Sequence, residues 1–363
     1  MSPARQNRLR DMNHPVLGGP ARRNPLRSGG SARRFTTSAG MPSSPRKKFR
    51  VRRAASLRLM ECPELTGKRW AWMEHGFTTR VGGTSLDPIG ASAQPGRHRN
   101  EKVLNLGRRA WDTDENVLEN RRRWLRAIRA GSAPPWRGER LALLRQRHTD
   151  FIHVADECFA GGRRRVGDAM ISRTPGVLLA VQAADCLPIL LADASRRAVA
   201  AVHAGWRGLL KRIVEKTVGR MRVAFDCRPG DLHAAIGPGI GVCCYEIGAE
   251  VRDAFTSQFA YAAELFAEGP ADPEAERLAA KYPNLFLAAR PPGHGPVADR
   301  TLLLDLSAAA RRQLLDAGLA DRHIYDSGFC THCRSDLFFS YRRERDHHGL
   351  QFGFIGILPS EPA

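Results

Sequence analysis

The feature that most constrains the fold is a series of short, almost entirely apolar runs between Leu141 and Ala204. Such runs are typical of strands that are covered on both faces. Segments that repeat apolar residues at helical spacing, at about 112–128 and 209–221, flank these runs. We therefore predict an α/β (α+β) fold, a single layered sandwich domain with a mixed β-sheet and flanking helices.

Basic residues are concentrated near the N-terminus. The chain carries a formal charge of +20, and residues 1–58 hold fifteen Lys or Arg and one acid, which leaves +6 for the other 305 residues. This segment has few large apolar side chains and cannot bury enough surface to fold alone. We interpret residues 1–58 as a disordered tail or an over-long start. A targeting segment and a nucleic-acid-binding arm are the alternatives. Residues 59–363 then form a single domain.

Cysteine usage and hydropathy indicate the compartment. The eight cysteines are unevenly spaced, which does not suggest a disulfide framework, and no export signal is visible. No apolar run reaches the roughly 18 residues that a membrane span needs. We expect a cytoplasmic monomer that does not contact a membrane and that meets nucleic acid only through the basic tail.

Three residues at the edges of strand-like runs are candidate metal ligands: His148, Cys186 and His203. Two imidazoles and a thiolate suit zinc, and three protein ligands leave a fourth position open, as in catalytic zinc sites. Their spacing matches no short zinc motif, and a cysteine between Ala and Leu is commonly a small core residue. Zinc is the expected cofactor, and copper is the alternative.

Several short blocks occur in an order that resembles a known family. They are Gln146-Arg-His148, Gly167-Asp168-Ala169, Ala184-Asp185-Cys186-Leu-Pro188, His203-Ala-Gly-Trp-Arg-Gly208, Ile236-Gly-Pro238, Cys244-Tyr-Glu-Ile-Gly248 and Phe338-Phe-Ser-Tyr-Arg-Arg343. They resemble the YfiH-type family, also called the multicopper polyphenol oxidase (laccase) domain or the purine nucleoside phosphorylase family. The resemblance covers about Trp70 to Leu358.

The resemblance implies a function and a site. Its members are associated with phosphorolysis of adenosine, inosine and methylthioadenosine and with adenosine deamination, so the partners would be purine nucleosides and phosphate. His148, Cys186 and His203 would be the zinc ligands of one catalytic domain, 59–363. Relative to the compact family pattern, about 261–298 is expected to be a surface insertion.

Catalytic roles can be assigned from this resemblance and from the residue chemistry. Deamination needs a general acid/base beside the metal-activated water, and Asp168 or Asp185 is the candidate. Asp168 can instead form a turn or orient a ligating imidazole. Arg207 lies at a predicted helix start, where free amides and a full charge favour an anion.

Further residues are expected to bind substrate or phosphate. The backbone amides of Gly82 and Gly83, beside Arg80, can hold an anion, although a plain hairpin is the alternative. Trp206 is either a packing residue or a stacking wall for a flat substrate. The full expected set is Arg80, Gly82, Gly83, Gln146, Trp206, Arg342 and Arg343.

The sequence departs from the family pattern at one position. Relatives usually have Thr-Gly-Arg after the Tyr-Arg-Arg block, whereas this chain has His348-Gly349-Leu350. If that arginine binds phosphate in relatives, phosphorolysis here is in doubt unless Arg342 or Arg343 compensates.

Two cysteine pairs need separate treatment. Cys330 and Cys333 form a Cys-x-x-Cys sequence that can join Cys243 and Cys244 in a four-thiolate zinc site. Adjacent cysteines are awkward as two ligands of one metal, so we favour free thiols packed near the active site.

Other functions stay open at this point. A zinc hydrolase that edits peptidoglycan precursors is one alternative. A copper-dependent polyphenol oxidase is another, although it needs more histidines than the body clusters. Outside the enzymes, the basic tail permits a nucleic-acid-binding protein, and a metal-stabilised scaffold without catalysis is also compatible.

Overall fold

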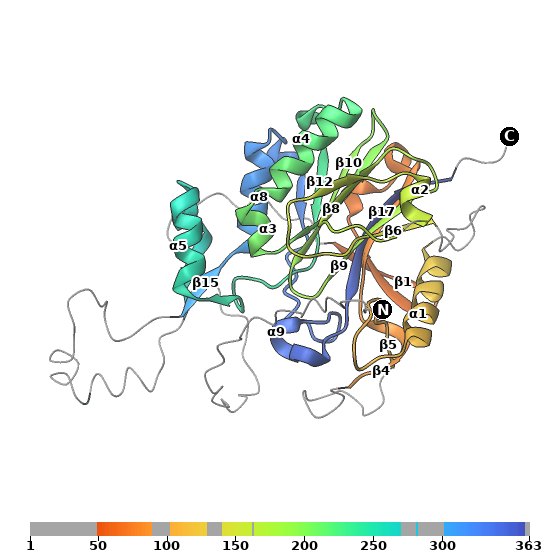
Figure 1. The fold of residues 1–363 in the computed structure, drawn as a ribbon, viewed down its shortest axis with the longest axis horizontal. Coiled ribbons are helices and arrows are strands. Elements are labelled where there is room, and N and C mark those ends of the chain that lie inside the picture. Colours follow the sequence, from red (N-terminus) through yellow and green to blue (C-terminus); the bar gives the residue numbers. More distant parts are fainter. Residues whose placement is uncertain are drawn as a thin grey trace, which may run out of the picture. The chain divides into compact units, whose positions relative to one another are not determined.

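The computed structural model describes residues 49–88, 102–128, 140–161, 163–269, 281 and 301–359. Its centre consists of two six-stranded sheets (Figure 1). In spatial order, the first sheet contains β1 (Arg50–Ala54), β2 (Leu57–Glu61), β3 (Met73–Thr78), β17 (Gln351–Ile357), β9 (Leu178–Ala183) and β6 (Leu141–Leu143). The second contains β16 (Ile324–Asp326), β12 (His233–Ile236), β10 (Leu187–Asp193), β11 (Ala198–Ala204), β8 (Ala169–Ser172) and β7 (Ile152–Val154).

Both sheets are mixed, as predicted. The pairs β6–β9, β7–β8 and β12–β16 are parallel, and the remaining neighbours in these two sheets are antiparallel. The two sheets pack face to face through one apolar cluster, to which β9 contributes Leu179 and β10 contributes Leu190.

Strand β9 explains the continuous apolar runs in the sequence. Its residues alternate between the two faces of the sheet. Leu179 and Val181 enter the cluster between the sheets, whereas Leu178 and Ala180 enter a second cluster on the outer face. Because both faces are covered, a polar side chain in the middle of the strand would be buried and would lower the stability of the fold.

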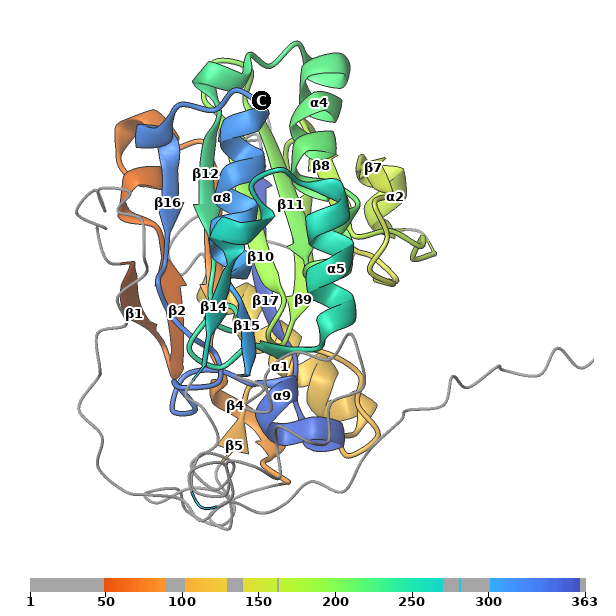
Figure 2. The same cartoon turned by 90° about the vertical axis from the view of Figure 1, so that its left-hand side faces the viewer.

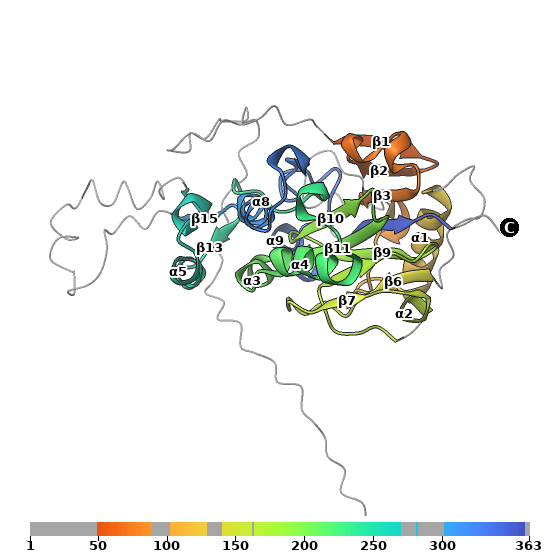
Figure 3. The same cartoon turned by 90° about the horizontal axis from the view of Figure 1, so that it is seen from above.

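Helices cover the outer faces. Helix α1 packs on the first sheet, and α4 and α8 pack on the second, so the layers run helix, sheet, sheet, helix (Figures 2 and 3). Among the described residues, no helix is long and apolar enough to cross a membrane. The α-helices are α1 (Asp114–Ala127), α2 (Glu157–Gly161), α3 (Trp206–Leu210), α4 (Ile213–Phe225), α5 (Ala249–Gln258), α8 (Leu306–Asp316) and α9 (Tyr341–Glu344).

Short elements complete the fold. A three-stranded sheet has the order β13 (Glu246–Ile247), β15 (Leu302–Leu304) and β14 (Phe266–Glu268), and a two-stranded sheet pairs β4 (Val81–Leu86) with β5 (Lys102–Val103). The 3-10 helices are η1 (Pro63–Leu65), η2 (Lys68–Trp70), η5 (Pro229–Asp231), η6 (Ala262–Leu265), η7 (Asp321–His323) and η8 (Arg345–His347).

Two predicted boundaries need correction. Phe49 is buried and β1 pairs with β2 along its whole length, so the body includes residues 49–58, which the prediction assigned to the tail. At the predicted insertion, 261–269 belongs to the fold, because Ala262 and Leu265 are buried in the core and β14 pairs with β15. Apart from Lys281, the remainder of 270–300 lies outside the described residues, as do 1–48.

Helix α1 was predicted, and its N-cap is Thr113, whose side chain accepts a hydrogen bond from the amide of Asn116. Its buried face centres on Trp124, which is fully buried and meets the rings of Phe352 and Phe354 edge-on at 5.2 and 5.1 Å between centroids. This contact attaches the helix to strand β17.

Replacing this indole tests the outer packing layer. We expect Trp124→Ala to lower the free energy of unfolding by about 3–5 kcal/mol, because it removes a large buried ring and leaves a cavity. Val223→Ala is the control, since Val223 is 79% exposed on α4 and should change stability by less than about 0.5 kcal/mol. Urea unfolding followed by circular dichroism measures both. Equal effects of the two changes would contradict the packing described.

Candidate metal centre

The structure brings His148, Cys186 and His203 together at one end of the two sheets. His148 lies in the connection from β6 to β7, and Cys186 lies in the connection from β9 to β10. Each of these connections passes from the first sheet to the second. His203 is the penultimate residue of β11, directly opposite Pro188 of β10. Residues that are distant in the sequence therefore meet at the junction of the two sheets.

The distances between these side chains suit one metal ion. The candidate ligand atoms of the three residues all lie within 4.8 Å of one another. The Cys186 Sγ and the His148 Nε2 are 3.8 Å apart, and the two imidazole centroids are 5.1 Å apart. A single ion bound by two imidazoles and a thiolate fits this spacing.

Gly205 permits this close approach. A Cβ atom at residue 205 would lie 2.6 Å from the Cys186 Sγ and 3.2 Å from the Cδ2 of His148. Any larger residue would displace these two side chains. The glycine two positions after His203 is therefore part of the site.

Asp168 holds the two histidine ligands in position through hydrogen bonds. Its side chain is fully buried, and one oxygen accepts a hydrogen bond from the Nδ1 of His203 at 2.9 Å. This contact leaves the Nε2 of His203 for the metal. The same carboxylate accepts the backbone amides of Arg147, His148 and Thr149 and the Thr149 hydroxyl, at 2.6–3.2 Å. Both oxygens are thus occupied, so Asp168 positions the two histidines and does not serve as a general base.

The charges within the site favour the metal-binding form of the cysteine. Burial raises the pKa of the Cys186 thiol, but the charge of His203 and the hydrogen bond with His148 lower it to about 6. Burial lowers the pKa of His203, but Cys186 and Asp168 raise it to about 10. Burial raises the pKa of Asp168, and its contacts with His203 and Thr149 bring it far below its usual range. A divalent cation would replace the imidazole proton beside the thiolate.

The residue before the cysteine ligand has a strained backbone. Asp185 has φ +92°, a conformation that costs a non-glycine residue on the order of 1–3 kcal/mol. Its carboxylate accepts the Thr331 hydroxyl at 2.6 Å and the Arg342 amide at 2.7 Å. These bonds hold the turn that presents Cys186. Asp185 therefore has a positioning role, which corrects its predicted assignment as a general acid/base.

Gln146 is also structural. Its side-chain amide donates to the carbonyl of Gln182 at 2.7 Å and accepts the amide of Gln182 at 2.8 Å. This pair of bonds fixes the end of β9, so Gln146 has a structural role in addition to the substrate contact that the sequence predicts.

The predicted anion site at Arg80 is a buried structural feature. The Arg80 side chain is 2% exposed and forms ion pairs with Asp87 at 2.8 Å and Glu344 at 2.6 Å. Gly82 and Gly83 belong to β4, not to an open turn, and a Cβ at either position would lie within 2.2 Å of a backbone oxygen. These residues allow close backbone approach, and the prediction that the three bind phosphate is corrected.

The two consecutive arginines of α9 differ. Arg343 donates to the carbonyls of Thr331, His332 and Phe338 and to Glu344, so its guanidinium is used in holding the fold. The guanidinium of Arg342 lies 5.3 Å from the centre of the Tyr245 ring. One Nη of Arg342 donates to the carbonyl of Glu246 at 2.8 Å, whereas Arg343 has four acceptors, so Arg342 retains donors for phosphate and Arg343 is committed to the fold.

Tyr245 connects the arginines to the metal centre. Burial raises the pKa of its hydroxyl, the charge of Cys186 adds to this shift, and Arg342 and Arg207 oppose it. The contact of Arg342 with the Tyr245 ring, at 5.3 Å, is the direct link between this tyrosine and a guanidinium. Arg207 is exposed and lies over the ring of Trp206 at 4.4 Å, which leaves its charge accessible.

Leu350 packs closely against Gly107. A Cβ added to Gly107 would lie 2.3 Å from the Cδ1 of Leu350, and the Leu350 amide donates to the side chain of Asn105. Residue 350, where the family pattern led us to expect arginine, is thus a half-buried packing residue in this chain.

Comparison with known proteins agrees with this fold. The sequence model for the family described as multi-copper polyphenol oxidoreductase laccase matches residues 74–358. The chain belongs to this family.

Similar proteins in the family are named purine nucleoside phosphorylases. A Shigella flexneri protein named purine nucleoside phosphorylase YfiH is 34% identical over 282 residues, covering 77% of this chain and 92% of that protein. A Deinococcus radiodurans protein named purine nucleoside phosphorylase is 33% identical over 305 residues, covering 84% and 94%. The crystal structure of YlmD from Geobacillus stearothermophilus has a TM-score of 0.64 and 29% identity and covers 85% of this chain and 98% of that one. These similarities confirm the predicted resemblance and the layered α/β fold, and they support an enzyme.

Two site residues were not predicted. Gly205 lies inside the His-Ala-Gly-Trp-Arg-Gly block, and Tyr245 lies inside the Cys-Tyr-Glu-Ile-Gly block. Both blocks were recognised as family motifs. The glycine in the first block and the tyrosine in the second could therefore have been predicted as site residues.

The contact at Gly205 generates a direct test. Gly205→Ala should displace the Cys186 sulfur and lower metal affinity about tenfold or more, because the added Cβ has no space. Gly219→Ala in α4 is the matched control, since a Cβ there meets nothing within 4 Å. Metal content after dialysis against a weak chelator measures the effect. Retention of the metal by both variants would contradict the geometry.

The role of Asp168 generates a second test. In Asp168→Asn the amide cannot accept every hydrogen bond that the carboxylate accepts, so the two histidines lose their support, and metal affinity should fall about 10- to 100-fold. Asp193→Asn is the control, because Asp193 is equally buried and also holds a turn, but at the far end of β10. Competition with a fluorescent chelator measures both constants. An unchanged affinity in Asp168→Asn would remove its positioning role.

Proposed function

We propose that this chain is a zinc-dependent purine nucleoside phosphorylase acting on adenosine, inosine and methylthioadenosine. The observation that carries the proposal is the convergence of His148, Cys186 and His203, backed by Asp168, in a chain whose relatives are named purine nucleoside phosphorylases.

The donor set fits zinc. Two neutral imidazoles and one thiolate are common zinc ligands, and three protein ligands are typical of catalytic sites. The Asp168 bond to His203 is the outer carboxylate contact that such sites have. Zinc bound there would supply Lewis-acid polarisation of a phosphate or substrate oxygen.

Phosphorolysis requires phosphate to be held against the sugar. An oxygen of phosphate forms a bond to C1′ while the bond from C1′ to the base nitrogen breaks, and the electron pair leaves with the base. Arg207 follows Gly205 and His203 in the same segment and lies over the Trp206 ring, and Arg342 lies 5.3 Å from the Tyr245 ring centre. Their guanidinium groups would bind the phosphate and offset its charge in the transition state.

The aromatic residues suit the nucleoside. Trp206 is half-exposed and packs on the core of the second sheet, and the Arg207 guanidinium lies over its ring at 4.4 Å, so a purine would stack on the indole when Arg207 turns toward phosphate. Tyr245 is protonated at neutral pH, as an ordinary tyrosine is, and burial raises its pKa further. Its hydroxyl can therefore donate a hydrogen bond to the departing base or to phosphate.

Phosphorolysis has better support than the other reactions. Deamination needs a free general acid/base, and the hydrogen bonds of Asp168 and Asp185 occupy the two candidates. Multicopper oxidation needs a further histidine cluster, and in the described part of the chain the second group of possible ligands contains only cysteines. Peptidoglycan-precursor hydrolysis has no feature here that favours it.

The central test is base release with and without phosphate. Purified protein with about one zinc at this centre should release hypoxanthine from inosine only when phosphate is present, with ribose 1-phosphate as the second product. His148→Ala should lose this zinc and more than about 99% of the activity, because a ligand is removed. A panel adds adenosine with ammonia detection, a phenol and a nucleotide-linked muramyl peptide. Turnover of one of these without inosine phosphorolysis would reject the proposal.

The role of the arginine is tested separately. Arg207→Ala should lower kcat/KM for phosphate about 10- to 100-fold, which corresponds to the loss of a charged hydrogen bond. Metal content should not change. Arg222→Ala, an exposed arginine on α4, is the control and should retain full activity. If both variants match the parent, phosphate is bound elsewhere.

A further inference from the structure

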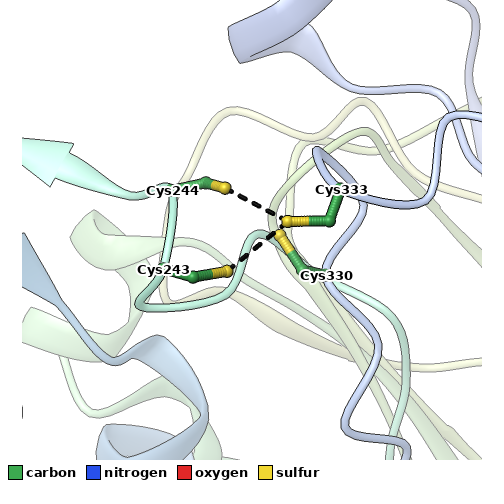
Figure 4. A group of neighbouring side chains, drawn as sticks. All are labelled: Cys243, Cys244, Cys330 and Cys333. Carbon is green, nitrogen blue, oxygen red and sulfur yellow. Dashed lines mark hydrogen bonds between the residues drawn. The ribbon is translucent and has the colours of Figure 1, made fainter. Parts of the chain in front are cut away.

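We propose that Cys243, Cys244, Cys330 and Cys333 form a second metal site, a closed structural zinc centre with four thiolate ligands. The four side chains converge from two loops that are distant in the sequence (Figure 4). They are separate residues from the three-ligand centre, so a chain with both sites loaded holds two zinc ions.

The sulfur positions suit a metal and not disulfides. The Sγ of Cys333 lies 3.7 Å from that of Cys243 and 3.4 Å from that of Cys244, and all four sulfurs lie within 4.8 Å of one another. A tetrahedral zinc ion with bonds of about 2.3 Å holds its sulfurs about 3.8 Å apart. A disulfide requires about 2.05 Å, and all four cysteines are free.

The local backbone lets two adjacent cysteines face one ion. In an extended strand Cys243 and Cys244 would point to opposite sides. Here they lie in a turn, in which the amides of Cys244 and Tyr245 both donate to the carbonyl of Gly241 at 3.0 and 3.1 Å. Figure 4 shows both sulfurs directed toward the other pair. Because of this turn, two adjacent cysteines can both be ligands of one metal ion.

The second pair has the geometry of a metal-binding turn. The amide of Arg334 donates to the carbonyl of Cys330 at 3.0 Å, which closes the Cys-x-x-Cys segment. The Gly241 amide donates to the Cys330 Sγ at 3.2 Å and so joins the two loops. Amide donors of this kind support the charge of a thiolate ligand.

Positive charge adjoins the cluster. Four thiolates around a divalent ion leave a net charge of −2. Arg343 donates through its Nη1 to the carbonyls of Thr331 and His332, within the turn that carries Cys330 and Cys333. This guanidinium, which also pairs with Glu344 at 2.8 Å, fixes the turn and keeps positive charge beside it. The half-buried Arg343 thereby has a structural role.

The metal is zinc and its role is structural. Thiolates select soft or borderline metals, and four of them close the coordination sphere so that no position is left for substrate. The two loops that the site joins also adjoin the first centre: Thr331 bonds to Asp185, and Tyr245 follows Cys244. The ion would hold these two contributors in place.

Metal counting tests the proposal on the full-length protein. The parent should contain about two zinc ions per chain. Cys333→Ser and Cys243→Ser should each contain one, and His203→Ala should also contain one, because the two sites share no ligand. Cys158→Ser is the matched control, since Cys158 is exposed and outside both clusters, and it should retain two.

A second measurement needs no variant. In the native parent, alkylation followed by peptide mass spectrometry should spare the four cysteines, and removal of zinc with a chelator should expose all four. One zinc per parent chain, lost entirely in His203→Ala, would overturn the proposal. Rapid alkylation of the four thiols without chelator, a disulfide among them, or iron in place of zinc would do the same. None of these results would affect the phosphorolysis assay at the first centre.

Discussion

The site depends on one buried carboxylate. Asp168 has no exposed surface, and a carboxylate can be buried only when its charge is compensated by hydrogen bonds. Its two oxygens accept hydrogen bonds from the imidazole of His203, from three consecutive backbone amides and from a hydroxyl. One side chain therefore sets the orientation of one histidine and the backbone of the other. Asp168 immediately precedes β8, so the pairing of β8 with β11 fixes the position of Asp168. The hydrogen bonds of Asp168 then fix the positions of His148 and His203.

The sequence predicted the elements whose signal is local. Apolar runs identified strands covered on both faces, helical spacing identified α1 and α4, and the residue types of His148, Cys186 and His203 identified a metal centre. Roles that depend on partners distant in the sequence could not be predicted. Arg80 resembled an exposed anion ligand, but its partner Glu344 lies 264 residues away. Asp185 resembled a free base, but Thr331, which holds it, is 146 residues distant.

Glycine and cysteine positions show a second limit of sequence reasoning. The pair Gly82–Gly83 is typical of a turn, yet it permits β4 to approach neighbouring backbone, a constraint that exists only in three dimensions. Two adjacent cysteines were judged unsuitable for one ion because an extended backbone separates their side chains. The turn around Gly241 reverses that geometry. In both cases the local sequence allowed two conformations, and tertiary contacts selected one.

The path of the chain between the sheets has a mechanical consequence. Strands β9 and β10 are consecutive but belong to different sheets, and only Ala184–Cys186 joins them. The sheets also meet through apolar side chains across their interface. An ion bound by His148 and Cys186 would join two such crossings at one end of the sandwich. Without it, that end would lose one link between the sheets, so its stability would depend on metal occupancy as well as on the apolar core.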